Sequence, residues 1–356
     1  MRLATKLLAV PAILALGLTA CSTSTPAGPK SDTSSAASAD SSASKSSESS
    51  EAAGGVSCGT PSDIKKGDGS KTVYLVSKGF QHRFWQAVKE GAEAAGKDLG
   101  YKVEFVGPPS EKDVAIQIDQ LETAVKTGPA AIGFAALDTK AASDTLKQIS
   151  EKKIPLIAFD SGVDSDDPLT TVSTDNKAAA AEAAKHMVEL VGGKGTVGLV
   201  CHDVTSQTGK QRCEGFQEYV KQNAPDIKLL PHLVAGSVEE ATGAAKSLIQ
   251  SNSDIVGIYG TNEASATGAV QAATEVNKEG LKVVGFDSGA IQIKAIKEGK
   301  QAGAVTQSPI KIGCETVIAA VKAINGDSLP KNIDSGFAWY DKSNIESPEI
   351  KANLYE

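Results

Sequence analysis

Short apolar runs separated by amphipathic stretches dominate the sequence after Lys71. The first four runs lie at 73–77, 103–106, 131–136 and 154–159. The stretch from Phe84 to Leu99 places apolar residues on one helical face and charged residues on the other, and a glycine follows it. This alternation of strands and helices predicts repeated βα units with a parallel sheet.

The same alternation resumes later in the chain. Because 356 residues exceed the size at which one hydrophobic core usually keeps growing, two smaller doubly wound sheets fit better than one large sheet. The expected later strands lie at 196–201, 255–259, 283–286 and 304–306, and helices are expected to begin near Asn176, Gln207, Val238, Glu263, Ala290 and Ile310.

Residues 1–20 have the features of a targeting segment. A positively charged start precedes an apolar run at 7–18 that is too short for a permanent membrane span. The sequence Leu-Thr-Ala-Cys at 18–21 resembles the signal of a bacterial lipoprotein, in which cleavage precedes the cysteine and the thiol of Cys21 is acylated. An ordinary secretory signal with an incidental cysteine is the alternative.

The segment after Cys21 lacks the residues that build a core. Residues 22–55 contain 13 Ser and no Val, Ile, Leu, Met or aromatic residue, so burial cannot offset the entropy of ordering them. We therefore expect residues 21–70 to comprise the lipidated cysteine and a disordered, Ser-rich tether that lets the folded part stand off the membrane.

Charge and cysteine content narrow the class of protein further. The formal net charge is −7 and the calculated pI is 5.3, and no block rich in Lys or Arg offsets it, so nucleic acid is a poor partner. Four cysteines remain besides Cys21. An even number in an exported protein favours disulfides over metal or redox chemistry, and three pairings are possible.

Polar residues follow the expected strands in a consistent way. The carboxyl ends of parallel strands are where such sheets bind ligands, and planar carboxylates and amides suit the adjacent hydroxyls of a sugar or polyol. An aromatic pair, Phe84-Trp85, could cover the apolar face of a sugar ring. Helix or turn capping is the alternative at each position taken alone, but five strand ends agree: Ser77, Asp160-Ser161, Asn262, Asp287-Ser288 and Gln307.

From about Lys71 to the end, the chain resembles the periplasmic sugar-binding proteins of the ribose and galactose type, which are solute receptors of ABC importers. Single motifs would be weak, but the whole set occurs in the family's order. The motifs lie at 152–160, 173–176, 212–216, 260–263, 283–287 and 305–309.

The resemblance implies a set of ligand contacts. Asp160, Asn262, Asp287 and Gln307 match the family's sugar-hydroxyl partners, Phe84 and Trp85 match its aromatic pair, and Ser77 matches a polar contact. Four positions depart from the family pattern. An aromatic residue often found in the family is missing near Gly236-Ser237. His82 replaces a common asparagine, Ser161 replaces a common arginine, and Lys210 precedes Arg212 where the family usually has an arginine. Either Lys210 or Arg212 is therefore expected to reach the ligand.

The resemblance also implies the type I periplasmic binding protein fold, with two lobes joined by three hinge strands. The N-terminal lobe would comprise 71–173 plus 308–335, and the C-terminal lobe 174–307 plus 336–356. Because Cys58 and Cys314 would then share one lobe and Cys201 and Cys213 the other, these are the expected disulfides. The implied function is capture of a monosaccharide or polyol by lobe closure and its delivery to an importer permease by a monomeric, lipid-anchored, extracytoplasmic receptor.

Other functions have less support. Asp160 and Asp287 could suggest a glycosidase, but the surrounding motifs resemble binding proteins, and no common catalytic motif is present. His82, His186, His202 and His232 have no metal-ligand spacing, so we expect neither a metal nor a cofactor. A DNA-binding repressor is excluded because a signal and a tether occupy the N-terminus. Output to a sensor, and a furanose-like signal or nucleoside as ligand, remain open.

Overall fold

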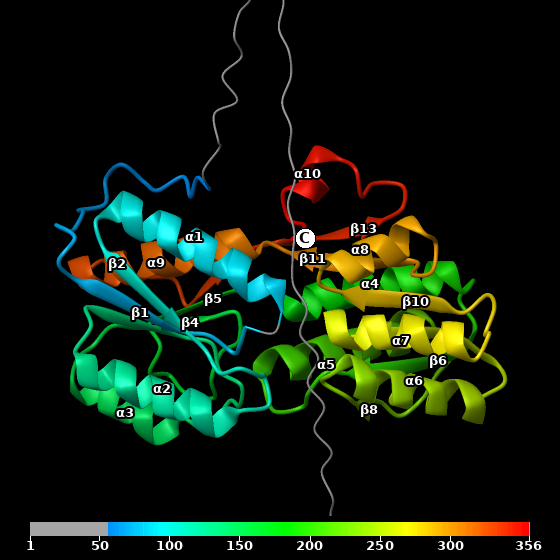
Figure 1. The fold of residues 1–356 in the computed structure, drawn as a ribbon. Helices are drawn as coiled ribbons and strands as arrows, with labels where there is room; N and C mark the ends of the chain where they lie inside the picture. The colour runs from blue at the N-terminus through cyan, green and yellow to red at the C-terminus, as the bar shows by residue number, and fades with distance from the viewer. Residues whose placement is uncertain (1–55, 81, 356) are drawn as a thin grey trace, which may run out of the picture. The chain divides into compact units, whose positions relative to one another are not determined.

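Two separate β-sheets organise the computed structural model, which describes residues 56–80 and 82–355 (Figure 1). The first sheet is parallel throughout, with the strand order β12-β5-β4-β3-β1-β2. Its strands are β1 (Thr72–Val76), β2 (Lys102–Val106), β3 (Ala131–Phe134), β4 (Leu156–Phe159), β5 (Thr170–Ser173) and β12 (Asn332–Asp334).

The second sheet has the order β13-β11-β10-β9-β6-β7, with β8 also paired to β6. All of its pairs are parallel except β11 with β13, which is antiparallel. Its strands are β6 (Gly195–Cys201), β7 (Ile227–Leu229), β8 (Leu233–Val234), β9 (Ile255–Gly260), β10 (Lys282–Phe286), β11 (Gly303–Gln307) and β13 (Phe337–Asp341).

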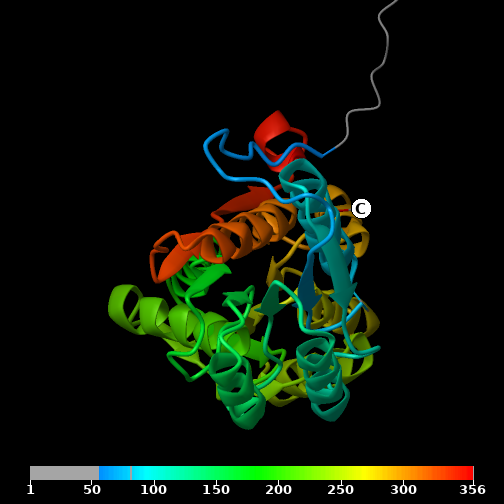
Figure 2. The same ribbon diagram turned by 90° about the vertical axis from the view of Figure 1, so that its left-hand side faces the viewer.

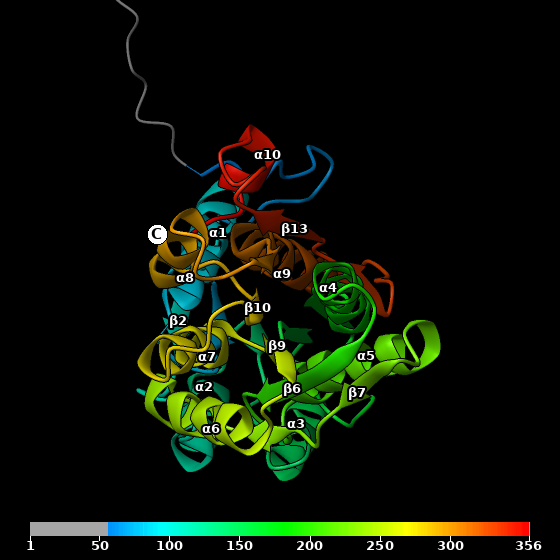
Figure 3. The ribbon, with the colours of Figure 1, turned by 90° about the vertical axis from the view of Figure 1, so that its right-hand side faces the viewer.

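Helices cover both faces of each sheet, so each sheet and its helices form one lobe. On the first sheet, α1 (Arg83–Leu99) packs beside α9 (Pro309–Asn325), and α2 (Val114–Thr127) packs with α3 (Ser143–Glu151) (Figure 2). On the second, α4 (Asn176–Leu190) and α5 (Gln207–Asn223) form one pair, and α6 (Val238–Ser251) and α7 (Glu263–Glu275) the other (Figure 3). Two shorter helices, α8 (Ala290–Lys297) and α10 (Pro348–Lys351), complete the second lobe.

The α/β class with two doubly wound sheets, predicted from the sequence, is confirmed. Every predicted strand and helix is present, with ends shifted by at most a few residues. The short strands β5, β7, β8 and β12 were not expected as strands, because two to four residues give too little hydrophobic pattern. One shift affects the site: Gln307 is the last residue of β11 instead of following it.

The chain passes between the sheets three times: after β5, after β11 and after β12. These three crossings meet at the buried hydroxyl of Thr174, which follows β5. The hydroxyl contacts the side-chain oxygen of Gln307 at 3.0 Å, the hydroxyl of Ser335 at 3.2 Å and the carbonyl of Gly336 at 3.4 Å. A side chain from the first crossing therefore touches both of the others.

Two disulfides lie within the described residues, Cys58–Cys314 in the first lobe and Cys201–Cys213 in the second, with Cα atoms 5.4 and 6.0 Å apart. Neither disulfide joins the two lobes. None of the described helices is long and apolar enough to cross a membrane.

The disordered tether predicted for residues 21–70 extends too far towards the C-terminus, because its last residues are attached to the first lobe. Ile64 is buried in the core of the first lobe, and the amides of Gly67 and Gly69 donate to the carbonyls of Leu99 and Gly100. The prediction of disorder is therefore wrong for residues 58–70, since a disulfide and an apolar side chain fix them to the lobe. The targeting segment 1–20, Cys21 and the Ser-rich residues up to 55 lie outside the described residues.

We predict that replacing both Cys58 and Cys314 by Ser lowers the free energy of unfolding by about 2–5 kcal/mol, because the crosslink restrains a long loop of the unfolded chain. Denaturant unfolding followed by circular dichroism measures this change. Since the disulfide joins residues of one lobe, ligand affinity should stay within about twofold. An unchanged midpoint would contradict a stabilising role.

Candidate ligand-binding site

A cavity lies where the carboxyl ends of strands from both sheets face one another. The first sheet contributes residues that follow β1, β2 and β4, and the second contributes residues at the ends of β6, β9, β10 and β11. The lining comprises Lys78, His82, Phe84, Trp85, Glu111, Asp160, His202, Thr208, Arg212, Asn262, Asp287 and Gln307.

The two central carboxylates occupy equivalent positions in the two lobes. Asp160 follows β4 within the sequence Phe-Asp-Ser, and Asp287 follows β10 within the same tripeptide. Each donates its amide to a carbonyl of the next strand, Val172 for Asp160 and Val305 for Asp287. Both have positive φ angles, 56° and 76°, a conformation that non-glycine residues seldom adopt outside special sites.

Asp160 is buried, and within the described residues only burial and nearby charges, not a hydrogen bond, affect its side chain. Burial raises its pKa from 3.8 to about 6, although Lys78 and Arg212 oppose the rise. A buried carboxylate without hydrogen-bond donors is unfavourable by itself. This arrangement indicates an acceptor prepared for donors from a ligand.

Asp287, in contrast, already has protein partners. One carboxylate oxygen accepts from the side-chain amide of Gln307 at 2.7 Å, and the other accepts from the amide of Glu263 at 3.2 Å. The guanidinium of Arg212 lies 3.7 Å from the second oxygen. The orientation of this carboxylate is therefore fixed before any ligand is present.

Arg212 reaches the cavity, whereas Lys210 does not. Arg212 is buried, donates to Asn176 at 2.7 Å and to the carbonyl of Thr261 at 3.2 Å, and stacks over the ring of Phe286. Lys210 instead donates to the hydroxyl of Thr139 in the other lobe at 2.9 Å. The two residues lie on different faces of α5, so their roles differ: one lines the cavity and one joins the lobes.

Both amides expected at the site are partly occupied by the protein. The side-chain oxygen of Asn262 caps α7 by accepting from the amide of Ser265 at 2.9 Å. Gln307 contacts Thr174 through its oxygen and Asp287 through its nitrogen. Capping and ligand contact are thus compatible at Asn262, because capping uses the side-chain oxygen and a ligand can use the side-chain nitrogen, which is a donor.

Phe84 and Trp85 form the aromatic wall, with ring centroids 5.0 Å apart and planes nearly perpendicular. Trp85 is held on one side by the edge of Phe159 and on another by a 2.8 Å hydrogen bond from its indole nitrogen to Glu111. The wall is therefore rigid, and its orientation depends on a carboxylate from the loop after β2.

Ser77 and Ser161 do not line the cavity. The hydroxyl of Ser77 lies within hydrogen-bond distance of the carbonyls of Gly79 and Val106, and its side chain is fully buried. Ser161 is also fully buried, and its hydroxyl has no partner within the described residues. The lining therefore gives no support to the ligand contacts expected at Ser77 and Ser161. Ser77 directly follows β1 and Ser161 is the second residue after β4, so the turn at each strand end decides which side chain enters the cavity.

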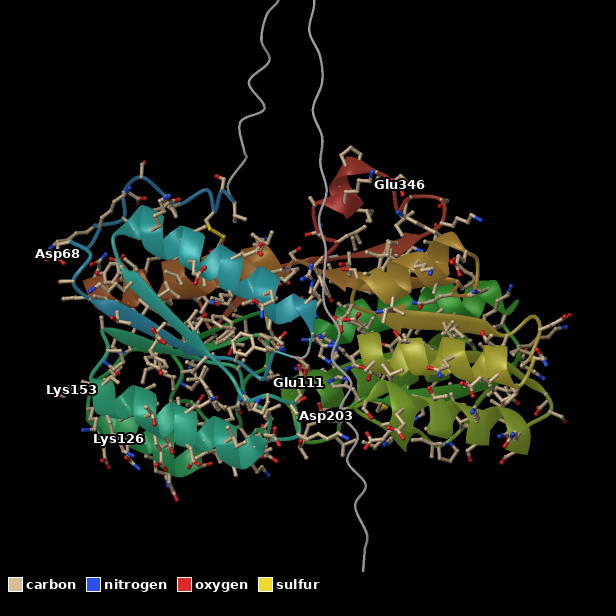
Figure 4. The ribbon with its side chains drawn as sticks, viewed as in Figure 1. Asp68, Glu111, Lys126, Lys153, Asp203 and Glu346 are labelled. Atoms are coloured by element: carbon tan, nitrogen blue, oxygen red, sulfur yellow. A yellow bond between two sulfur atoms is a disulfide. The ribbon has the colours of Figure 1, made fainter. Side chains whose placement is uncertain are left out.

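Four lining residues were not among the predicted ligand contacts: Lys78, Glu111, His202 and Thr208. Lys78 and His202 come directly after Ser77 and Cys201, so applying the strand-end rule to the next residue and to β6 would have found them. Lys78 is buried between carboxylates. Burial lowers its pKa, but Glu111, Asp203 and Asp160 outweigh this effect and raise it. Figure 4 labels Glu111 and Asp203, which come from loops of different lobes.

Several cavity residues also connect the two lobes. The Lys78 ammonium donates to the hydroxyl of Thr208 at 3.1 Å and lies 3.7 Å from Glu111. His82 lies 3.6 Å from Glu263, and its pKa is raised because Glu263 and Glu111 outweigh the opposing effect of burial. Below their raised pKa values, Lys78 and His82 each hold a positive charge between carboxylates.

The other two histidines lie elsewhere. His186 stacks on Trp339 and contacts Glu182 and Glu189, and His232 does not line the cavity. Within residues 56–80 and 82–355, no three His, Cys, Asp or Glu side chains are grouped as metal ligands.

Two lobes, three crossings and a polar cavity between opposed strand ends define a two-lobed solute-binding protein. The periplasmic binding protein domain matches residues 73–328. The chain therefore belongs to the periplasmic binding protein family, and its fold is the type I arrangement.

Individual relatives agree with this assignment. The chain is 24% identical over 262 residues to a ribose import binding protein of Haemophilus influenzae, covering 74% of this chain and 88% of that protein. An ABC transporter solute binding protein of Agrobacterium vitis with bound D-fucose is 30% identical, covers 80% of this chain and 100% of its own, and superposes with a TM-score of 0.76. A carbohydrate transporter solute binding protein of Agrobacterium radiobacter in complex with D-arabinose is 32% identical, with coverages of 80% and 98% and a TM-score of 0.76. These relatives are binding proteins and not enzymes, in agreement with the sequence analysis.

We predict that Asp160→Asn raises the stability of the ligand-free protein at pH 7. Because the folded-state pKa of about 6 exceeds the ordinary 3.8, the folded protein holds this proton more tightly than the unfolded chain, and stability falls as pH rises between these values. Ionised Asp160 thus costs on the order of 3 kcal/mol at pH 7. Asn removes this cost and also tolerates a positive φ.

The measurement is the melting temperature of both proteins from pH 4 to pH 8. The advantage of the variant should be several degrees at pH 7 and shrink towards pH 4. Asp287→Asn is the matched control and should melt lower than the wild type, since its carboxylate has hydrogen-bond donors. A lower melting temperature for Asp160→Asn at pH 7 would refute our account of this site.

Proposed function

We propose that this protein is an extracytoplasmic receptor that captures a monosaccharide or related polyol between its lobes and delivers it to an ABC importer. The observation that carries the proposal is the pair of carboxylates, Asp160 and Asp287, presented by equivalent turns of two lobes beside an aromatic wall. The names of the relatives support the class of ligand and the transport role.

The chemistry of the cavity suits a neutral, hydroxylated ligand. Carboxylate oxygens accept from hydroxyls, while Arg212 and the nitrogen of Asn262 can donate to hydroxyl oxygens. Each hydrogen bond that involves a charged group contributes about 1.5–3 kcal/mol. The rings of Phe84 and Trp85 offer an apolar surface to the C–H face of a sugar ring. The ligand contacts predicted at His82, Asp160, Arg212, Asn262, Asp287 and Gln307 are all compatible with this lining.

Binding acts by favouring contact between the lobes. Lys78 and Lys210 already donate to hydroxyls of the opposite lobe, and Lys112 of the first lobe pairs with Glu240 of the second. Because the three crossings are the only covalent links between the sheets in the described residues, the lobes can separate by bending there. A ligand shifts this equilibrium by its preference for the closed arrangement.

The proposal includes the predicted lobe boundaries, the lipid anchor at Cys21 and the monomeric state. Cys58–Cys314 fixes the start of the described chain to the first lobe, so a tether from Cys21 would hold the receptor by that lobe. An anchored receptor remains close to a membrane permease.

We predict that a thermal-shift screen with D-ribose, D-allose, D-arabinose, D-fucose, polyols and nucleosides identifies at least one sugar that raises the melting temperature. A ligand at 100 times its dissociation constant adds about 2.7 kcal/mol to stability. Calorimetric titration then gives stoichiometry, expected to be one sugar per chain. A shift with nucleosides only would replace the sugar by another polar ligand, and no shift with any compound would contradict the proposal.

We further predict that Arg212→Met and Lys210→Met affect this binding differently. Loss of the cavity guanidinium should weaken the binding of the identified sugar by about tenfold or more, since a charged hydrogen bond is lost and Asp287 loses its cation. Lys210→Met removes the same charge from the same helix but lies outside the cavity lining, so it should change affinity only a few-fold. Equal effects in titration calorimetry would contradict the placement of these residues.

A further inference from the structure

The last residues of the chain connect the second lobe to the aromatic wall of the first. After β13 the chain forms α10, and Ile350 and Leu354 pack with Ile293 and Ile296 of α8. The next residue, Tyr355, is buried with the core residues of the first lobe. Its ring meets that of Phe84 edge to face, with centroids 5.8 Å apart and planes at 69°.

The same segment is hydrogen-bonded to the turn that carries Asp287. The Tyr355 hydroxyl accepts from the amide of Ser288 at 3.0 Å. The carbonyl of Asn353 accepts from the hydroxyls of Ser288 at 3.2 Å and Thr306 at 2.9 Å. One side chain therefore contacts a cavity residue of the first lobe and the backbone next to a cavity carboxylate of the second.

Comparison of the two equivalent turns shows what the C-terminal segment adds. In the first lobe the hydroxyl of Ser161 is buried without a partner in the described residues, and its amide donates only to the nearby carbonyl of Phe159. In the second lobe Asn353, Thr306 and Tyr355 satisfy both the hydroxyl and the amide of Ser288. The C-terminal segment thus supplies hydrogen-bond partners to the turn at Asp287, and the turn at Asp160 has no equivalent partners among the described residues.

We propose that Tyr355 is a positioning residue for the ligand site, which keeps the Phe84 wall and the Asp287 carboxylate at a fixed separation when the lobes are in contact. The tyrosine side chain is stiff, with few rotatable bonds, and both of its ends are occupied. Separation of the lobes must therefore break either the contact with Phe84 or the hydrogen bond to Ser288. The proposal rests on the proposed function, because it assigns Tyr355 a role in retaining the captured sugar.

The test compares Tyr355→Ala and Tyr355→Phe with Leu248→Ala. Leu248 is a buried residue of α6 in the core of the second lobe, and the apolar cluster to which it belongs contains none of the residues that line the cavity. Stopped-flow tryptophan fluorescence with D-ribose, D-allose, D-arabinose and D-fucose gives association and dissociation rates. Tyr355→Ala should raise the dissociation constant about tenfold, mainly through faster dissociation. Tyr355→Phe should raise it about twofold to threefold, since the ring contact remains.

Leu248→Ala separates positioning from general stability. It should lower the melting temperature at least as much as Tyr355→Ala, because it leaves a cavity in the core, while the dissociation constant stays within twofold. If Tyr355→Ala also leaves the dissociation constant within twofold, or changes only the melting temperature, the proposal is wrong.

Hydrogen exchange without ligand keeps the proposal testable if none of these sugars binds. Tyr355→Ala should speed amide exchange both at Ser288 and in residues 83–88, Tyr355→Phe should speed it at Ser288 only, and Leu248→Ala at neither. Unchanged exchange in both segments of Tyr355→Ala overturns the inference. Absence of sugar binding by the wild type, with the exchange pattern as expected, overturns the sugar-receptor function and leaves the connection between the lobes intact.

Discussion

A single hydrogen-bonded chain links the cavity to the points where the chain crosses between lobes. The Asp287 carboxylate accepts from Gln307, the oxygen of Gln307 accepts from Thr174, and Thr174 also contacts Ser335 beside the third crossing. Gln307 is itself the last residue of β11, directly before the second crossing. These groups are buried in this arrangement of the lobes, and each has a hydrogen-bond partner in it. A ligand that displaces the Asp287 carboxylate would therefore also alter the hydrogen bonds of Gln307 and Thr174 at the crossings.

Charge compensation explains how so many ionisable groups can share one buried site. Lys78 pairs with Glu111, Arg212 with Asp287 and His82 with Glu263, and each pair would be costly to break by removing one partner. Asp160 is the exception, with raised pKa and no hydrogen bond to its side chain in the described residues. Most charged side chains of the cavity are thus paired within the protein, and one carboxylate is left to accept hydrogen bonds from the captured molecule. Burial of the ionised Asp160 lowers the stability of the ligand-free protein, and hydrogen bonds from a bound ligand can offset this loss.

The sequence predicted the fold and the centre of the site because both depend on local patterns. Apolar runs and amphipathic stretches mark strands and helices, and parallel strands bring their carboxyl ends to one edge, which is why Asp160, Asn262 and Asp287 were found together. Lys78 and His202 were missed because the strand-end rule was not applied to the second residue after β1 or to the end of β6. Glu111 lies in an irregular loop and Thr208 in the first turn of α5, where no strand end marks them. Ser77 and Ser161 lie near strand ends but outside the cavity lining, since a strand end alone does not tell which of the residues that follow it enters the cavity.

The sequence by itself determined the α/β alternation, the two-sheet architecture and the polar residues at the strand ends, because backbone geometry and side-chain period are local properties of the chain. Only the tertiary structure decided that Arg212 and not Lys210 enters the cavity, that Thr174 joins the three crossings, and that Tyr355 reaches Phe84. Each of these contacts joins residues far apart in the chain. Their distances depend on how whole helices pack, which no short stretch of sequence specifies.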